Sequence, residues 1–71
     1  MLVDVRIDGE KVRVARERAF LSKSELAESA GLNRNTIGRI EESDTTEVYP
    51  RTIRKIAQAL SVDPASLTPK E

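Results

Sequence analysis

The sequence predicts an all-α fold, a bundle of five short helices joined by brief connections. Apolar residues recur at intervals of three and four in several segments, which is the spacing of one helix face. Capping residues precede these segments, and glycine or proline follows them. With 71 residues the chain makes one small domain. We expect an N-terminal segment at residues 1–8, a helical domain at 9–68 and a tail at 69–71.

The N-terminal segment has the alternation of a short strand over residues 2–7. Val3, Val5 and Ile7 lie on one face of this strand. An isolated strand is unstable in water and needs a partner. Two interpretations are open: it pairs with the same strand of a second chain, or it is a frayed tail whose valines lean on the helices.

The first helix is expected at about residues 9–20. Asp8 can cap its N-terminus, and Asp8-Gly9 separates it from the strand. Val12, Ala15 and Ala19 then share the face that packs inward, because they are three or four residues apart.

Two helices joined by a tight turn form the most specific pattern in the sequence. Ser22 and Glu25 have the spacing of a capping box, so the second helix begins there and ends at residue 30. Gly31 supplies the left-handed conformation that ends it, and Asn33 is a good N-cap for the third helix, which ends near residue 42. Ala27 is small enough to lie where the two helices cross. Together these residues specify a helix-turn-helix.

Two further helices follow a break at residues 48–50. One runs from about Arg51 to Leu60, and a short fifth helix begins at Asp63-Pro64, a capping residue followed by proline. The apolar residues at helical spacing predict this core: Val12, Leu21, Leu26, Leu32, Ile37, Ile40, Ile53, Ile56, Leu60 and Leu67.

Composition argues against several classes of protein. The chain has no cysteine and no histidine, so it lacks a thiolate nucleophile, the commonest general base and the usual metal ligands. We expect no enzyme, no metal and no cofactor. Because the chain has no cysteine for a disulfide, we expect a protein of the reducing cytoplasm. Because no apolar run approaches the ~20 residues that span a bilayer, we expect no membrane partner. The twelve basic and twelve acidic residues balance, which lowers the expected non-specific affinity for nucleic acid.

A set of residues between positions 10 and 67 has the spacing of a known family. The set comprises Arg16, Leu21-Ser22, Glu25-Leu26-Ala27, Ala30-Gly31-Leu32, Thr36-Ile37, Arg39-Ile40-Glu41, Ile53, Ile56-Ala57, Ala59-Leu60 and Val62. In these positions the chain resembles the Xre/Cro/CI-type helix-turn-helix family of phage repressors and bacterial regulators. The resemblance implies a lambda-repressor-like bundle and a sequence-specific transcriptional regulator that binds double-stranded DNA.

The resemblance also implies which residues read DNA bases. In this family the first exposed residues of the third helix touch base edges, and here these are Arg34, Asn35 and, one turn later, Arg39. Arginine fits the O6 and N7 atoms of guanine, and asparagine fits N6 and N7 of adenine. Thr36 is expected at a phosphate or a thymine methyl. Gly38 either allows a close approach of the DNA backbone or is a tolerated change.

Phosphate contacts are implied at the starts of the second and fourth helices. The family usually has glutamine where this chain has Lys23, which keeps a phosphate contact through its charge. Arg51 and Thr52 at the start of the fourth helix are further candidates, with Arg54 ranked below them. These contacts position a protein on DNA without reading sequence.

An ion pair between Arg16 and Glu41 is implied as a structural element. In the family this pair ties the first helix to the third and is partly buried. Its loss would leave an unpaired charge and destabilise the fold.

The acidic loop at residues 42–47 keeps a second function open. Many relatives have a basic loop there, beside the DNA backbone. The leading hypothesis is a homodimer on an inverted repeat, held together by the N-terminal strand or by the region around the fifth helix. The alternative is a protein-interaction module, such as an antitoxin or anti-regulator partner, that binds a protein through residues 42–47 and binds DNA weakly or not at all. The chain can also be the DNA-binding fragment of a longer regulator.

Overall fold

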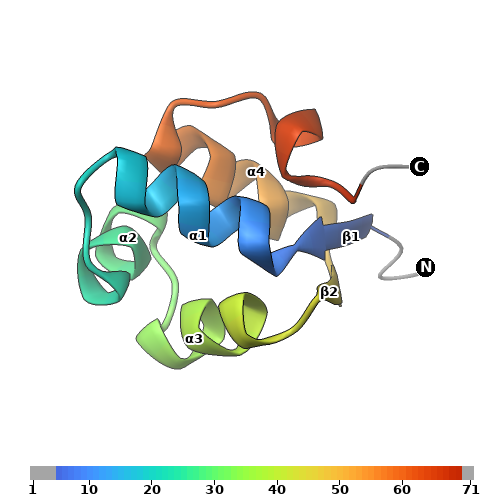
Figure 1. The fold of residues 1–71 in the computed structure, drawn as a ribbon, viewed down its shortest axis with the longest axis horizontal. Helices are drawn as coiled ribbons and strands as arrows, with labels where there is room; N and C mark the ends of the chain where they lie inside the picture. The colour runs from blue at the N-terminus through green and yellow to red at the C-terminus, as the bar shows by residue number, and fades with distance from the viewer. Residues whose placement is uncertain (1–4, 70–71) are drawn as a thin grey trace.

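The structure is a computed structural model and describes residues 5–69. These residues form four α-helices and a two-stranded antiparallel sheet. The elements are β1 (Val5–Asp8), α1 (Gly9–Arg18), α2 (Lys23–Ala30), α3 (Arg34–Glu42), β2 (Thr45–Val48), α4 (Pro50–Leu60) and the 3₁₀ helix η1 (Pro64–Leu67). Figure 1 shows α1 in front of α4, α3 along the lower edge, and α2 and the sheet at opposite ends. None of the helices within residues 5–69 is long and apolar enough to cross a membrane.

A single apolar cluster fills the space between the helices and the sheet. Eight of the ten predicted core residues are buried in it, and Leu21 and Leu32 are half-buried against it. The helical spacing therefore predicted most of the core correctly. The small residues Ala27, Ala30 and Ala57 are also buried, where helices approach each other closely. The buried apolar residues are Ile7, Val12, Leu26, Ala27, Ala30, Ile37, Ile40, Val48, Ile53, Ile56, Ala57, Leu60 and Leu67.

The N-terminal strand is paired within the same chain, so its interpretation as a frayed tail is wrong for residues 5–8. A contact of this strand with a second chain stays a prediction. β1 covers Val5–Asp8 and pairs antiparallel with β2, with Ile7 opposite Thr46. Ile7 is completely buried, because the apolar face of the strand is used by the core of its own chain. The predicted strand residues Leu2 and Val3 lie outside the described residues.

The segment expected as an acidic loop is partly a strand. β2 takes up residues 45–48, where three of the four residues are β-branched and Val48 is buried. The predicted break at residues 48–50 is therefore wrong at Val48, which belongs to β2. The chain turns at Tyr49, and α4 begins at Pro50, one residue earlier than expected.

The fifth helix is a four-residue 3₁₀ helix, so the expected five-helix bundle has four α-helices. The amide of Ser66 donates to the carbonyl of Asp63, and that of Thr68 donates to Ala65, which is the three-residue spacing of a 3₁₀ turn. Pro64 starts the segment and Pro69 follows it closely, which leaves too few residues for an α-helix. Leu67 is buried as predicted.

α1 ends at Arg18, two residues before the expected end, in a turn with an unusual residue. Phe20 has φ of 60°, the left-handed conformation that normally favours glycine. The amide of Leu21 donates a hydrogen bond to the carbonyl of Arg16, and the amide of Phe20 donates one to the carbonyl of Glu17, as in a Schellman motif. Because the helix stops here, Ala19 is exposed, and its predicted inward position is wrong.

Phe20→Gly is expected to raise the free energy of unfolding by about 1 kcal/mol. A side chain in the left-handed region costs about 1–2 kcal/mol, part of which is offset because glycine gains entropy in the unfolded chain. The Phe20 side chain is 93% exposed, so little packing is lost. Chemical denaturation measures the change. Ala19→Gly, next to it but with an ordinary φ of −87°, is the control and is expected to destabilise.

Candidate nucleic-acid interface

The turn between α2 and α3 has the geometry that its sequence predicts. Ser22 and Glu25 form a reciprocal capping box at the start of α2. Gly31 ends α2 with φ of 70°, and the amide of Leu32 donates to the carbonyl of Ala27 over 2.8 Å. Ala27 is 3% exposed, so its small side chain lies in the packed interior. The two helices are therefore held at a fixed angle by backbone hydrogen bonds and close packing.

One face of α3 is buried and the other is open to solvent. Ile37 and Ile40 are buried, whereas Arg34, Asn35 and Arg39 are exposed. The helix begins at Arg34, and the side chain of Asn33 caps it by accepting from the amide of Asn35 over 2.7 Å. The predicted base-reading residues are thus the first two residues of an exposed helix and one residue a turn later. Thr36 and Gly38 are half-buried.

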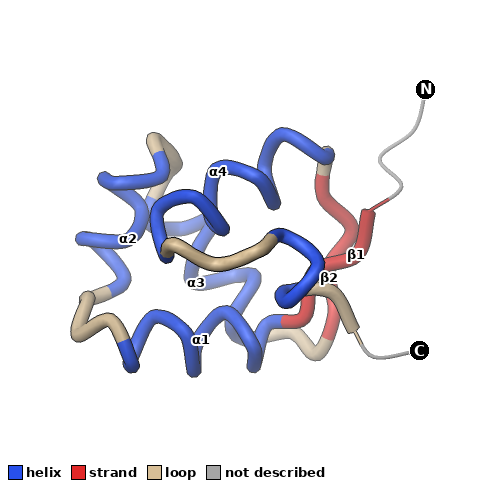
Figure 2. The backbone as a smooth tube through the Cα atoms, turned by 90° about the horizontal axis from the view of Figure 1, so that it is seen from above, coloured by secondary structure: helices blue, strands red, loops and turns tan. Residues whose placement is uncertain are grey.

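The predicted phosphate residues lie at the starts of α2 and α4. Lys23 is the first residue of α2, and Arg51 and Thr52 are the second and third residues of α4. Arg54 is exposed one turn further along α4. Figures 1 and 2 show α2 at one end of the molecule and the start of α4 at the other, beside the sheet, with α3 between them along the long axis. The two groups therefore flank α3.

The N-terminus of α4 differs from those of α1, α2, α3 and η1. At each of these four, a backbone amide donates to the side chain of the capping residue, which is Asp8, Ser22, Asn33 or Asp63. Tyr49, the capping residue of α4, accepts no such bond. Pro50 has no amide hydrogen and the amide of Thr52 donates to the carbonyl of Tyr49. The amide of Arg51 therefore has no side-chain acceptor within the described chain, and an anion satisfies such an amide well.

Tyr49 is a residue of this surface that the sequence analysis did not single out. The guanidinium of Arg51 lies 5.3 Å from the centre of the Tyr49 ring, and this ring is 53% exposed. The cation–π contact orients the arginine at the start of the helix. An aromatic residue beside Pro50 and two positions before an arginine was the available signal in the sequence.

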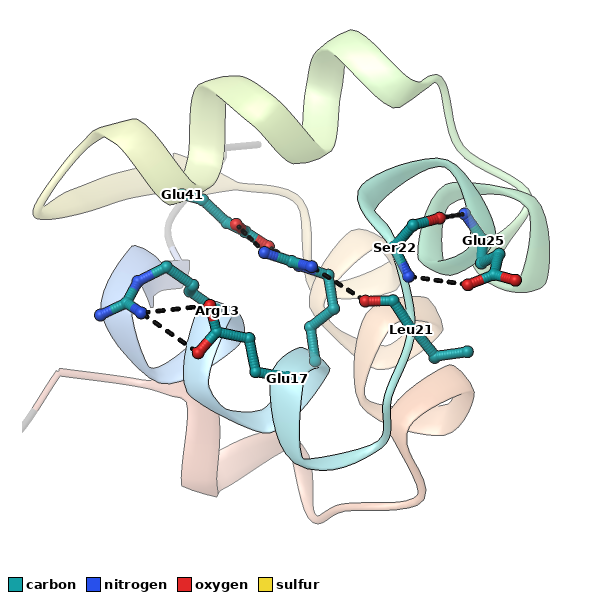
Figure 3. Close-up of polar contacts among 7 residues, drawn as sticks. Arg13, Glu17, Leu21, Ser22, Glu25 and Glu41 are labelled. Carbon is teal, nitrogen blue, oxygen red and sulfur yellow. Dashed lines mark hydrogen bonds and ion pairs between the residues drawn. The ribbon is translucent and has the colours of Figure 1, made fainter.

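The ion pair between Arg16 and Glu41 joins α1 to α3. Nε and Nη2 of Arg16 donate to the two carboxylate oxygens of Glu41 over 2.7 and 3.1 Å, and Nη1 donates to the carbonyl of Leu21 over 2.9 Å (Figure 3). The two side chains are only 12% and 3% exposed. The hydrogen bond to Glu41 raises the pKa of Arg16, while desolvation opposes the shift and the charges of Glu41 and Glu17 add to it. The pair fixes α3 against the body of the protein.

Charge is divided along α3 although the whole chain is neutral. Arg34 is exposed in its first turn and Arg39 in its last turn, whereas Glu42 and Asp44 are exposed at and beyond its C-terminal end. A shallow pocket near that end is lined mainly by carboxylates, including those of Asp8 and Glu10. The surface suited to an anionic polymer is therefore the part of α3 from Arg34 to Arg39, with the starts of α2 and α4 on either side.

The fold and this surface define a helix-turn-helix protein. A family model described as a helix-turn-helix domain matches residues 9–68. The chain therefore belongs to the helix-turn-helix domain family, and it is of the Xre/Cro type. A comparison with curated protein sequences gave no match.

Solved structures with the same fold include two kinds of protein. The restriction-modification controller protein C.AhdI from Aeromonas hydrophila is 33% identical with a TM-score of 0.75, over 82% of this chain and 86% of that one. A variant of hydroxyethylphosphonate dioxygenase is 26% identical with a TM-score of 0.80, over 93% of this chain. This chain spans only 14% of that enzyme, so the likeness concerns a small part of it.

Proposed function

We propose that this protein is a transcriptional regulator that binds double-stranded DNA and reads the major groove with α3. The observation that carries the proposal is the exposed row of Arg34, Asn35 and Arg39 on a helix whose opposite face is buried. These side chains match the hydrogen-bonding edges of guanine and adenine. Membership of the helix-turn-helix family and the likeness to a controller protein support the same function.

Phosphate contacts on both sides of α3 would position it in the groove. On one side Lys23 offers its charge at the start of α2. On the other side the amide of Arg51, the guanidinium of Arg51 and the hydroxyl of Thr52 offer hydrogen bonds and charge to a phosphate oxygen. The dipole of each helix adds to the attraction of an anion at its N-terminus.

The protein is proposed to act as a homodimer on an inverted repeat. A single α3 reads only a few base pairs, and helix-turn-helix dimers place two reading helices about 34–36 Å apart, one turn of DNA. The apolar face of β1 is poorly suited as the interface of such a dimer, because Ile7 is already buried in its own chain.

Arg34→Ala/Asn35→Ala is expected to lower the affinity for the selected DNA about 100-fold, because each lost base contact is worth about 1–3 kcal/mol. Selection from a random duplex library by the wild-type protein supplies the sequence, and titration at one salt concentration measures the loss. Both residues are exposed, so circular dichroism should be unchanged. Glu28→Gln, exposed on α2, is the control. The proposal is contradicted if the folded wild-type protein enriches no sequence at low salt.

Arg51→Ala is expected to reduce the slope of log affinity against log salt concentration by about one, without changing which sequence is preferred. The reason is that a phosphate contact releases counterions but reads no base. Titrations at several salt concentrations measure the slope. Lys55→Ala, also exposed on α4 but facing a pocket it shares with Ser29 and Gln58, is the matched control. An equal change of slope in the two variants would remove Arg51 from the interface.

A protein-interaction module is the second candidate function, favoured by the acidic surface around Glu42 and Asp44. Such a surface repels phosphate and suits a basic protein partner. Salt separates the two functions, since DNA affinity falls steeply with salt whereas binding of a protein partner need not.

A further inference from the structure

One flank of the molecule carries exposed apolar side chains that the proposed DNA surface does not use. In the described residues three large apolar side chains are exposed: Val14, Phe20 and Tyr49, at 37%, 93% and 53%. Tyr49 stacks on Arg51 at the start of α4. The other two belong to α1 and to the turn directly after it, which leaves the flank formed by α1 without a partner.

A groove of about 750 Å³ runs along this flank, between α1 and the chain around η1. Val14, Ala15 and Ala19 contribute apolar atoms to it from α1, and Leu60 and Leu67 contribute them from the other side. Figure 2 shows η1 above the helices and α1 at the edge of the molecule. Phe20 directly follows Ala19, so a projecting aromatic residue adjoins one end of an apolar groove.

The outer face of α1 carries charges of opposite sign on either side of Val14. Glu10 lies one helical turn before Val14 and Arg18 one turn after it, and all three line the groove. If two copies of α1 pack antiparallel about a two-fold axis at Val14, each Glu10 lies near Arg18 of the other copy. The row of Glu10, Val14 and Arg18, called the α1 stripe below, is therefore complementary to itself, as a symmetric interface requires.

We propose that a second copy of this chain docks on this flank, with α1 antiparallel to α1 and Phe20 at the η1 end of the partner's groove. The proposal rests on the proposed dimer and names its surface. The left-handed Phe20 supports it, because strained backbone often lies at functional sites and this residue also exposes a large apolar side chain, unlike the left-handed Ser61. Figure 1 shows α3 along the lower edge below α1, so a two-fold axis perpendicular to α1 and directed toward that edge leaves both α3 helices on one side.

Charge reversal on the α1 stripe tests the antiparallel pairing by sedimentation equilibrium at low salt. Glu10→Arg and Arg18→Glu should each raise the dimer dissociation constant about tenfold, because each places like charges together at two symmetric contacts. The double variant Glu10→Arg/Arg18→Glu should return to within about threefold of wild type. Both changes oppose the helix dipole of α1, so an effect through stability alone would be largest in the double variant.

Phe20→Gly tests the aromatic contact separately. It should dissociate the dimer while the melting temperature rises, which separates docking from folding. Glu28→Arg, exposed on α2, is the charge control and should leave association unchanged. A wild-type protein that stays monomeric at submillimolar concentration overturns the proposal, as does a double variant no better associated than the single ones.

Binding to a single half-site separates this proposal from the proposed function. Glu10→Arg should bind one half-site as tightly as wild type and lose only cooperative binding to the repeat. If the wild-type protein is monomeric but still binds half-sites, the proposed docking surface is rejected and the proposed DNA binding stands. If the protein forms a dimer that follows the charge-reversal pattern but binds no DNA, the proposed DNA binding is rejected and the docking surface stands.

Discussion

Gly9→Ala is expected to lower the free energy of unfolding by more than about 3 kcal/mol, a large share of the stability of so small a domain. Gly9 is buried at the start of α1, and its amide donates to the carbonyl of Asp44 over 3.1 Å. A Cβ there would overlap the backbone carbonyl oxygens of Ile40 and Ser43. Because these atoms belong to the end of α3 and to its cap, relief requires α1 and α3 to separate. Urea denaturation measures the change.

Gly38→Ala is the matched control for this substitution. A Cβ at Gly38 meets no atom within 4 Å, and the residue lies inside α3, where alanine is preferred by about 0.5–1 kcal/mol. Stability is therefore expected to rise. If the two variants were equally stable, close packing at Gly9 would not be the cause. The same Gly38 variant tests for close DNA approach, because a Cβ facing the backbone of DNA would lower affinity while stability increases.

Glu41→Gln is expected to destabilise the protein by about 3 kcal/mol, because it leaves the cation of Arg16 without its counter-charge in a largely buried position. Glutamine keeps the size of the side chain and one acceptor, so the change isolates the charge. Thermal and urea unfolding measure it. Glu17→Gln removes the carboxylate that Arg13 bonds at the exposed surface of α1 and should cost less than about 1 kcal/mol. Equal losses in the two variants would contradict a special role for the buried pair.

The contribution of Arg16 should not vary with pH in the ordinary range. The hydrogen bond to Glu41 raises the pKa of Arg16 in the folded state. A raised pKa stabilises the fold fully below the pKa of the unfolded chain and loses this effect as pH rises through the folded value. For an arginine that window is strongly alkaline. Stability curves of the wild type between pH 6 and 9, compared with those of Glu41→Gln, should therefore differ by a constant amount.

Local sequence predicted the elements whose ends are set by nearby residues. Ser22 with Glu25, Gly31 and Asn33 define the ends of α2 and the start of α3, because capping acts within a few residues. Errors arose where the next few residues did not decide the structure. α1 was extended to Phe20, since nothing in the local pattern shows a phenylalanine taking the place of a helix-ending glycine.

The candidate site was predictable for the same reason, except at the start of α4. Arg34, Asn35 and Arg39 are exposed because the spacing of Ile37 and Ile40 turns the other face of α3 inward. The stacking of Arg51 on Tyr49 and the missing side-chain cap of α4 were not foreseen, because they depend on side-chain orientation at a turn. Whether these residues contact DNA remains a prediction for the experiments above.

The sequence by itself determined the helix-turn-helix, the exposed face of α3 and most of the core, because helical periodicity and capping are local properties of the chain. Only the tertiary structure decided the partner of β1 and the conformation of residues 45–48, which lie about forty positions apart and meet as two paired strands. The close contact of Gly9 with the end of α3 depends on the same meeting. Strand pairing and close backbone contacts form between distant segments, and a single strand does not specify its partner.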